Sequence, residues 1–281
     1  MDSWIEVGID IGGTKMLLLA QGKDFRTRLQ LATGGDFSGA DAEMAIVQFI
    51  QTLPIPPKSI GIAVPGLVNE QGTVIACDVL PQIVDWAPSV NLQAICPVSV
   101  INDAEAALFQ VVEDLQPKTV AIVVMVGTGI GAAIYVNGQI LRGAKGWAGE
   151  LGSIPIETDG NTLDRIASGA AILEQLDVDI DRLNTLVAAN DSIAIDVIRR
   201  SGDALGLGLA TVINLLNPES IVLAGGTLRW EGYLDAALQS AKRHSQADLW
   251  AACKIQTSLH EDELVVLGAM QFAKDNATRS G

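Results

Sequence analysis

Two copies of one local pattern constrain the fold of this chain more than any other feature of its sequence. In the first copy, the apolar run at residues 4–9 leads into the glycine-containing segment 10–15 (DIGGTK). In the second copy, the apolar run 120–126 leads into 127–131 (GTGIG), and a further apolar run follows at 132–136. Each copy predicts a strand, a glycine turn and a second strand.

Each copy also ends at a dipeptide typical of a hairpin turn. The first ends at residues 21–22 (QG) and the second at 137–138 (NG), which is a strong type I′ signal. Two such hairpins in one chain predict a duplicated domain with a phosphate between the halves.

The two glycine turns are candidate phosphate sites, because their backbone N–H groups can surround an anion. The alternative is that each is only a turn, since glycine-rich motifs are common and weak. Asp10 at the mouth of the first turn favours the phosphate interpretation, because its carboxylate could hold a water-coordinated Mg²⁺ beside a phosphate. The glycine patterns of P-loop and dinucleotide-binding proteins are absent, which argues against both folds.

Length and charge bound the class of protein. A chain of 281 residues is long enough for two domains of ordinary size. The net charge of −15 repels nucleic acid and anionic membranes, so we expect neither as a partner.

The few cysteines and histidines argue against disulfide bonds and a zinc site. Three distant cysteines and two histidines form neither a disulfide framework nor a zinc motif. The first residues carry no basic segment or signal-like apolar run, so we expect a cytoplasmic protein. Residues 119–136 are uncharged and nearly long enough to span a bilayer, but the glycine turn within them favours two buried strands.

The remaining periodicity predicts alternating helices and strands. Strands are predicted over 59–64, 98–101 and 220–223, and helices over 40–53, 104–115, 170–176, 182–189, 191–200, 202–216 and 264–273. We place the domain boundary near residue 117, with a smaller first domain over 1–117 and a larger second domain over 118–261. The last segment, 262–281, is expected to pack back on the first domain.

Three carboxylates are candidates for chemistry. Asp103 lies where a predicted strand passes into a helix, a position that suits a general base acting on a hydroxyl, although Asp at such a position most often caps the helix. Glu150, in a glycine-rich stretch, could accept hydrogen bonds from sugar hydroxyls or be a solvated loop charge. Asp164 has the same two interpretations.

An ordered series of motifs resembles the ROK family of sugar kinases, within the larger group that shares the hexokinase and actin fold. The segments that carry the resemblance are 10–15 (DIGGTK), 61–66 (GIAVPG), 80–81 (LP) with Trp86, 102–104 (NDA), 127–131 (GTGIG) and 223–226 (LAGG). The resemblance covers nearly the whole chain. It implies an α/β fold of two duplicated RNase H-like domains, of the actin and hexokinase type, with a cleft between them.

The resemblance also implies roles for individual residues. Asp103 would be the base that takes the proton from a sugar hydroxyl, and Gly66, Asn102, Glu150 and Asp164 would hold the sugar. Mg²⁺ would lie near Asp10. ATP would be bound by the glycine turns, through Gly12, Gly13, Thr14, Lys15, Gly127, Thr128, Gly129, Gly225 and Gly226. Lys15 could instead pack its stem along a strand.

Two departures from the family pattern concern zinc and sugar. Ser153 stands where the family has a histidine that binds zinc and sugar, and residues 157–163 replace its cysteine-rich zinc loop. We therefore expect no structural zinc. Asp164 stands in place of a sugar-binding glutamate and is shorter by one methylene.

These features lead us to expect ATP-dependent phosphorylation of a hexose, with glucose and its 6-hydroxyl favoured, by a protein that the resemblance suggests is a homodimer. The alternatives are a kinase of fructose or an N-acetylhexosamine, a polyphosphate-dependent glucokinase, and a sugar-binding pseudokinase. Polyphosphate is disfavoured because 18 basic residues face 33 acidic ones. The repressors of the family carry a DNA-binding segment ahead of the first glycine turn, which here begins at residue 10.

Overall fold

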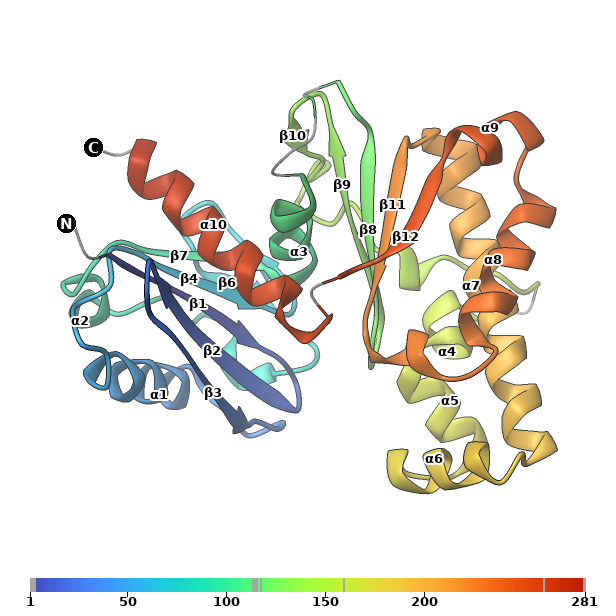
Figure 1. The fold of residues 1–281 in the computed structure, drawn as a ribbon, viewed down its shortest axis with the longest axis horizontal. Coiled ribbons are helices and arrows are strands. Elements are labelled where there is room, and N and C mark those ends of the chain that lie inside the picture. Colours follow the sequence, from blue (N-terminus) through green and yellow to red (C-terminus); the bar gives the residue numbers. More distant parts are fainter. Residues whose placement is uncertain (1–3, 113–115, 117, 159, 260, 280–281) are drawn as a thin grey trace. The chain divides into compact units, whose positions relative to one another are not determined.

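The computed structural model of the protein describes residues 4–112, 116, 118–158, 160–259 and 261–279 (Figure 1). The chain divides into two compact units. The first comprises Met1–Asp114, Gly143–Trp147 and Asp262–Gly281, and the second comprises Leu115–Arg142 and Ala148–Glu261. The boundary predicted near residue 117, and the end of the helix predicted to residue 115, lie outside the described residues.

The first unit is built on a five-stranded sheet with the strand order β3-β2-β1-β4-β7. Three of its strands are antiparallel neighbours, and two lie parallel to β1. Their bounds are β1 Ile5–Ile11, β2 Lys15–Gly22, β3 Arg26–Ala32, β4 Ile60–Val64 and β7 Val98–Asn102. The first glycine turn joins β1 to β2, as the sequence predicts.

The second unit repeats this arrangement with the order β10-β9-β8-β11-β12. The bounds are β8 Ala121–Val126, β9 Ile130–Val136, β10 Gln139–Ile140, β11 Ser220–Ala224 and β12 Lys254–Thr257. Again three antiparallel strands are followed by two parallel ones. The prediction of a duplicated α/β fold is therefore confirmed, and the apolar stretch 119–136 contributes β8 and β9. In the described part of the chain, no helix is long and apolar enough to cross a membrane.

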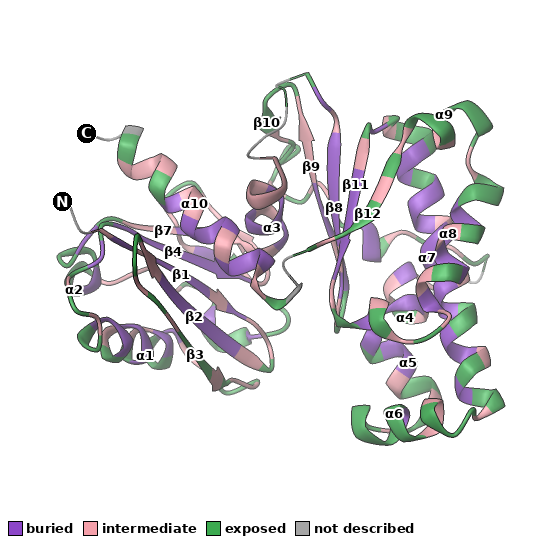
Figure 2. Ribbon diagram, in the orientation of Figure 1, coloured by how far each residue is buried: buried purple, intermediate pink, exposed green. Residues whose placement is uncertain are grey.

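Helices flank the sheet of the first unit, whose central strands are buried (Figure 2). They are α1 Gly39–Gln51, α2 Val90–Gln93, α3 Asp103–Val112 and α10 Leu264–Arg279; the short strands β5 Leu67–Val68 and β6 Val74–Ala76 pair beside them, with 3₁₀ turns at Pro81–Ile83 and Glu261–Glu263. The C-terminal helix α10 packs on β1 and β4, where glycines allow close contact: a Cβ built on Gly61 would lie 1.8 Å from the carbonyl oxygen of Ala269.

The second unit is richer in helices. They are α4 Leu163–Ala167, α5 Gly169–Leu176, α6 Ile180–Ala188, α7 Ser192–Leu216, α8 Tyr233–His244 and α9 Ala247–Ala252, with 3₁₀ turns at Leu151–Ser153 and Gly226–Arg229. The long helix α7 corrects one prediction, because the expected helices 191–200 and 202–216 are continuous. Gly202 does not break α7. It is buried where α8 packs on α7, and a Cβ there would lie 2.3 Å from the carbonyl oxygen of Tyr233.

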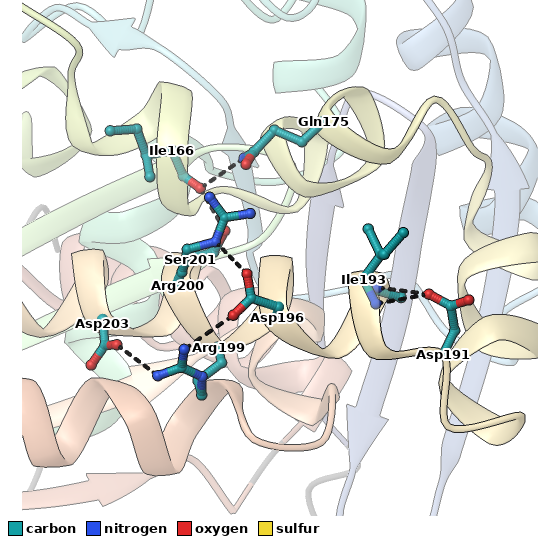
Figure 3. Close-up of polar contacts among 10 residues, drawn as sticks. Ile166, Gln175, Asp191, Ile193, Asp196, Arg199, Arg200, Ser201 and Asp203 are labelled. Atoms are coloured by element: carbon teal, nitrogen blue, oxygen red, sulfur yellow. Dashed lines mark hydrogen bonds and ion pairs between the residues drawn. The ribbon is translucent and has the colours of Figure 1, made fainter.

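Polar side chains lie at the N-terminal end and on the outer face of α7 (Figure 3). Asp191 caps its N-terminus by accepting hydrogen bonds of 3.0 Å from the N–H groups of Ile193 and Ala194. On the exposed face, Asp196 pairs with Arg199 and Arg200. Such surface ion pairs contribute little to stability individually, so the buried face of α7 carries most of its packing energy.

The buried hydroxyl of Tyr233 provides a test of how α8 is joined to α4. It donates a 2.5 Å hydrogen bond to the carbonyl oxygen of Ala167. Tyr233→Phe would leave that carbonyl without this donor, so we expect a loss of about 2 kcal/mol in the free energy of unfolding. Denaturant unfolding measures this loss. Tyr135→Phe, at the partly exposed second tyrosine of the chain, is the matched control, and an equal loss in both variants would contradict the assignment.

Candidate functional site

The carboxyl ends of three parallel strands form the candidate site of the first unit. In the register of the sheet, Asp10 of β1 lies beside Ala63 of β4, and Val64 of β4 lies beside Asn102 of β7. Because ligands bind at the carboxyl ends of strands in open α/β sheets, this edge is the expected position for chemistry. The structure brings together four of the residues predicted from the sequence: Asp10, Gly66, Asn102 and Asp103.

The side chain of Asn102 makes two hydrogen bonds at this edge. Its side-chain nitrogen donates a 2.8 Å hydrogen bond to the carbonyl oxygen of Gly66, and its side-chain oxygen accepts a 3.1 Å bond from the N–H of Glu105. The second bond is the N-terminal capping bond of α3. Gly66 has a φ of +101°, and a Cβ there would lie 2.1 Å from the carbonyl oxygen of Ala76, so only glycine fits.

The capping role of Asn102 bears directly on Asp103. The sequence leaves open whether Asp103 is a base or only a helix cap. In the structure the bond that spans the first turn of α3 is made by Asn102, whereas the Asp103 carboxylate accepts a 2.8 Å bond from the adjacent Ala104 N–H. Asn102 thus supplies a cap of α3 from the position before Asp103, which agrees with the chemical interpretation of Asp103.

Asp10 is a strongly perturbed carboxyl group at this edge. Burial and, to a smaller extent, the negative charge of Asp103 raise its pKa to about 7, and this value includes the opposing effect of Lys15. Two repelling carboxylates suit a nearby divalent cation, which would relieve the repulsion. Within the described residues, no three His, Cys, Asp or Glu side chains gather into a metal-binding group. A Mg²⁺ ion here would thus take most of its ligands from water and a phosphate, a pattern usual for this ion.

The raised pKa of Asp10 predicts how stability changes with pH in the absence of metal. Because the folded protein binds this proton more tightly than the unfolded chain, stability falls as pH rises from about 4 through about 7. If the whole rise in the pKa of Asp10 counted, the free energy of unfolding would fall by about 4 kcal/mol, at about 1.4 kcal/mol per pKa unit. Because Asp10 keeps some contact with solvent, we expect about half of that loss.

Thermal unfolding in EDTA at pH 5.5 and pH 8 measures this effect. Asp10→Asn should flatten the difference and be the more stable protein at pH 8. At that pH, adding Mg²⁺ should raise the melting temperature of the wild type more than that of the variant. An unchanged pH difference in Asp10→Asn would contradict the assignment.

The first glycine turn is held from both sides. Gly12 donates to the carbonyl oxygen of Lys15 at 2.8 Å, and the Thr33 hydroxyl donates to the carbonyl oxygen of Gly12 at 2.6 Å. A Cβ on Gly13 would lie 2.3 Å from a methyl carbon of Val79, so this side chain covers the turn. Thr14 is exposed at the tip, and the Lys15 ammonium lies 3.9 Å from the Asp262 carboxylate.

The second unit gathers the other two glycine turns. The carbonyl oxygen of Gly127 accepts a 2.8 Å bond from the N–H of Gly169 at the start of α5 and a 3.1 Å bond from the hydroxyl of Thr227. Gly225, with a φ of +117°, packs against the end of β8: a Cβ there would lie 2.2 Å from the carbonyl oxygen of Val126. The turn at 127–129 and the turn at 225–226 are therefore neighbours, and Thr128, Gly129 and Gly226 are exposed at their surface.

Thr227 has a role that sequence reasoning did not assign. Its signal was present, because Thr227 follows two glycines at a strand end just as Thr14 follows Gly12 and Gly13. In the structure its buried hydroxyl joins the two glycine turns of the second unit.

Glu150 and Asp164 lie in different environments within the second unit. Glu150 is exposed and directly precedes the 3₁₀ turn Leu151–Ser153, where Gly149, with a φ of +104°, packs against β9. Asp164 is half-buried on α4, and its Oδ1 accepts a 2.6 Å hydrogen bond from the N–H of Ile130. Burial raises the pKa of Asp164, and this hydrogen bond opposes the rise.

The fold agrees with a comparison of the whole sequence against known families. The ROK family matches residues 6–276, so the chain belongs to this family. Its members include sugar kinases and repressors, as the names of the relatives below show.

Three relatives are each 28% identical to this chain. The glucokinase of Halalkalibacterium halodurans aligns over 288 residues, covering 88% of this chain and 86% of that protein. An N-acetylmannosamine kinase of Vibrio cholerae aligns over 247 residues, covering 82% and 86%. The xylose repressor of Bacillus subtilis aligns over 197 residues, covering 63% of this chain but only 51% of the repressor.

Solved structures match along the whole chain. A ROK hexokinase from Thermus thermophilus has a TM-score of 0.77 at 25% identity, covering 99% of this chain and 100% of that one. A ROK family glucokinase from Streptomyces griseus, in complex with glucose and AMPPNP, has a TM-score of 0.79 at 22% identity, covering 96% and 99%. The fold is therefore that of the ROK hexokinases.

Proposed function

We propose that this protein is an ATP-dependent hexose kinase whose first-choice substrate is glucose. Membership of the ROK family and the relation to a glucokinase support the reaction class. The observation that carries the proposal is the arrangement of Asn102 and Asp103. Asn102 caps α3 and fixes Gly66, and the adjacent Asp103 carboxylate lies at the carboxyl edge of the sheet, where its charge acts on Asp10.

In the proposed reaction Asp103 is the general base. It takes the proton from the sugar hydroxyl as the hydroxyl oxygen attacks the terminal phosphorus of ATP, and ADP leaves. Gly66, Asn102 and Glu150 orient the sugar. The glycine turns at 12–15, 127–129 and 225–226 bind ATP through their N–H groups, and Lys15 adds a positive charge near the first turn. Asp10 would hold Mg²⁺ through water, and the ion would supply positive charge to neutralise the phosphates.

Glucose has one strong alternative as the substrate. The N-acetylmannosamine kinase is as similar to this chain as the glucokinase is, and its name makes an N-acetylhexosamine the second candidate substrate. ATP is preferred over polyphosphate as donor because the chain carries a net charge of −15, which repels a long polyanion. A cytoplasmic homodimer is part of the proposal and rests on the family resemblance.

A coupled assay for ADP release tests the proposal. Purified protein with Mg²⁺ and ATP is given glucose, mannose, fructose, N-acetylglucosamine and N-acetylmannosamine in turn, without added zinc. Turnover with glucose above the other sugars is the expected result. Turnover only with an N-acetylhexosamine would replace the substrate, and sugar binding without turnover on any member of the panel would indicate a sensor of the kind that the repressor relative suggests.

A further inference from the structure

The side chain of Asp164 lies against the second glycine turn. Its Oδ1 is 2.6 Å from the N–H of Ile130, the residue at which the turn becomes β9. Two glycines leave room for the carboxylate, because a Cβ built on Gly129 or on Gly152 would lie 3.3 Å from this oxygen. A short hydrogen bond to a partly desolvated carboxylate is among the stronger kinds, so it restrains the backbone at Ile130.

The helix that carries Asp164 is held by three other helices. Ser201 of α7 donates a 2.7 Å bond to the carbonyl oxygen of Ile166, and Gln175 of α5 donates a 3.3 Å bond to the same oxygen (Figure 3). Tyr233 of α8 donates a 2.5 Å bond to the carbonyl oxygen of Ala167. These bonds satisfy the last carbonyls of α4 and fix its position, so the Asp164 carboxylate is presented to the turn by a rigid support.

The other end of the turn is also held. The Gly127 carbonyl accepts bonds from Gly169 and Thr227, and the Thr128 carbonyl accepts a 3.2 Å bond from the N–H of Ala170. These three donors engage carbonyl groups at the start of the turn, whereas Asp164 engages an N–H group at its end. The turn is thus restrained at both ends, and Thr128 and Gly129 remain exposed at its tip.

We propose that Asp164 is a positioning residue for the phosphate-binding turn at 127–129, acting through the Ile130 N–H, and that its role is not to contact the sugar. The inference rests on the proposed function, in which this turn binds ATP. Preorganised N–H donors bind an anion without the cost of ordering the loop at the moment of binding. Loss of the anchor should therefore weaken nucleotide binding and leave sugar binding unchanged.

Two substitutions of Asp164 distinguish a residue that positions the turn at 127–129 from one that contacts the sugar. Asp164→Ala removes the acceptor and should raise the Kd of Mg²⁺·ATP by about tenfold or more. Asp164→Asn keeps an oxygen that can accept from Ile130 and should raise this Kd by at most about twofold. The Kd of glucose, measured by calorimetry, should stay within about twofold in both variants. Asp196→Asn, which removes one exposed carboxylate from α7, controls for the change in charge.

Three results would overturn the inference. They are a rise in the glucose Kd without a rise in the ATP Kd, unchanged binding of both ligands in Asp164→Ala, and equal loss of ATP binding in the Ala and Asn variants. The first result would assign Asp164 to the sugar, and the last would show that its charge matters and its hydrogen bond does not.

Amide hydrogen exchange of the wild-type protein gives a test that needs no variant to fold. The N–H of Ile130 should exchange at least about tenfold more slowly than an unprotected amide. Exchange at the unprotected rate would overturn the anchor. Failure of sugar turnover with intact ATP binding would remove the proposed kinase reaction and leave the anchor standing, whereas a wild-type protein that does not bind Mg²⁺·ATP would overturn both.

Discussion

Asp103→Asn is expected to lower kcat by about 10²–10⁴-fold while leaving the Kd of the sugar within a few-fold of the wild-type value. The substitution keeps the shape of the side chain and an oxygen that can accept the 2.8 Å bond from the Ala104 N–H, so the start of α3 is undisturbed. It removes the basic carboxylate. Loss of turnover with retained binding is the signature of a group that acts in the transition state.

The same variant carries an internal control for folding. The charge of Asp103 raises the pKa of Asp10, so removing it relieves repulsion between two neighbouring carboxylates. Above pH 7 the variant should therefore melt at the same temperature as the wild type or at a higher one. With that result, the loss of activity cannot be ascribed to unfolding. Asp78→Asn is the matched control. Asp78 is an exposed carboxylate in the same neighbourhood, since its charge and that of Asp103 both raise the pKa of Cys77. This variant should keep near wild-type turnover. Turnover of Asp103→Asn close to that of Asp78→Asn would refute the assignment of the base.

Much of the candidate site could be predicted from the sequence because parallel strands bring their carboxyl ends to one edge. Asp10 and Asn102 each lie at or next to the end of an apolar run, so local pattern was enough to place them together once the strands were parallel. The antiparallel pairing of β1 with β2 and of β8 with β9 follows from the predicted strand, glycine turn and second strand. The capping bond of Asn102 depends on a side-chain rotamer, which local sequence does not reveal.

Edge strands and small-residue interfaces were not predictable in the same way. The strands β3 and β12 are mostly exposed and lack a clear alternation of apolar and polar residues, so they have no strong pattern. The buried face of α8 is mainly alanine, which packs on glycines of α7: a Cβ on Gly206 would lie 2.5 Å from the carbonyl oxygen of Ala237. Such an interface depends on how closely the two helices approach each other. In the sequence, a glycine that permits this approach looks the same as a glycine that ends a helix.

The hydrogen bond of Asp164 could not be predicted from the sequence. Asp164 and Ile130 are separated by 34 positions, and nothing near either residue indicates the partner. From the resemblance alone Asp164 takes the role of the sugar-binding glutamate. The structure adds the Ile130 contact, which leads to the different role proposed above.

Gly61→Ala is expected to have the largest effect on stability, because its methyl group would collide with backbone atoms of α10. The added Cβ would lie 1.8 Å from the carbonyl oxygen and 2.3 Å from the carbonyl carbon of Ala269. A backbone atom cannot rotate away as the end of a side chain can, so α10 must move off β4. We expect a loss of about 3 kcal/mol or more and a fall in melting temperature of about 6–12 °C.

Gly131→Ala is the matched control, because Gly131 is also a strand glycine but has open space where its Cβ would lie. It should change the melting temperature by no more than about 2 °C. A shift of similar size in both variants would show that strand glycines matter for backbone reasons alone. Movement of α10 cannot stay local, since a Cβ on Gly268 of the same helix would lie 1.7 Å from the carbonyl oxygen of Ala106 in α3. The last helix of the chain thus supports the start of α3, and Gly61→Ala should lower activity together with stability.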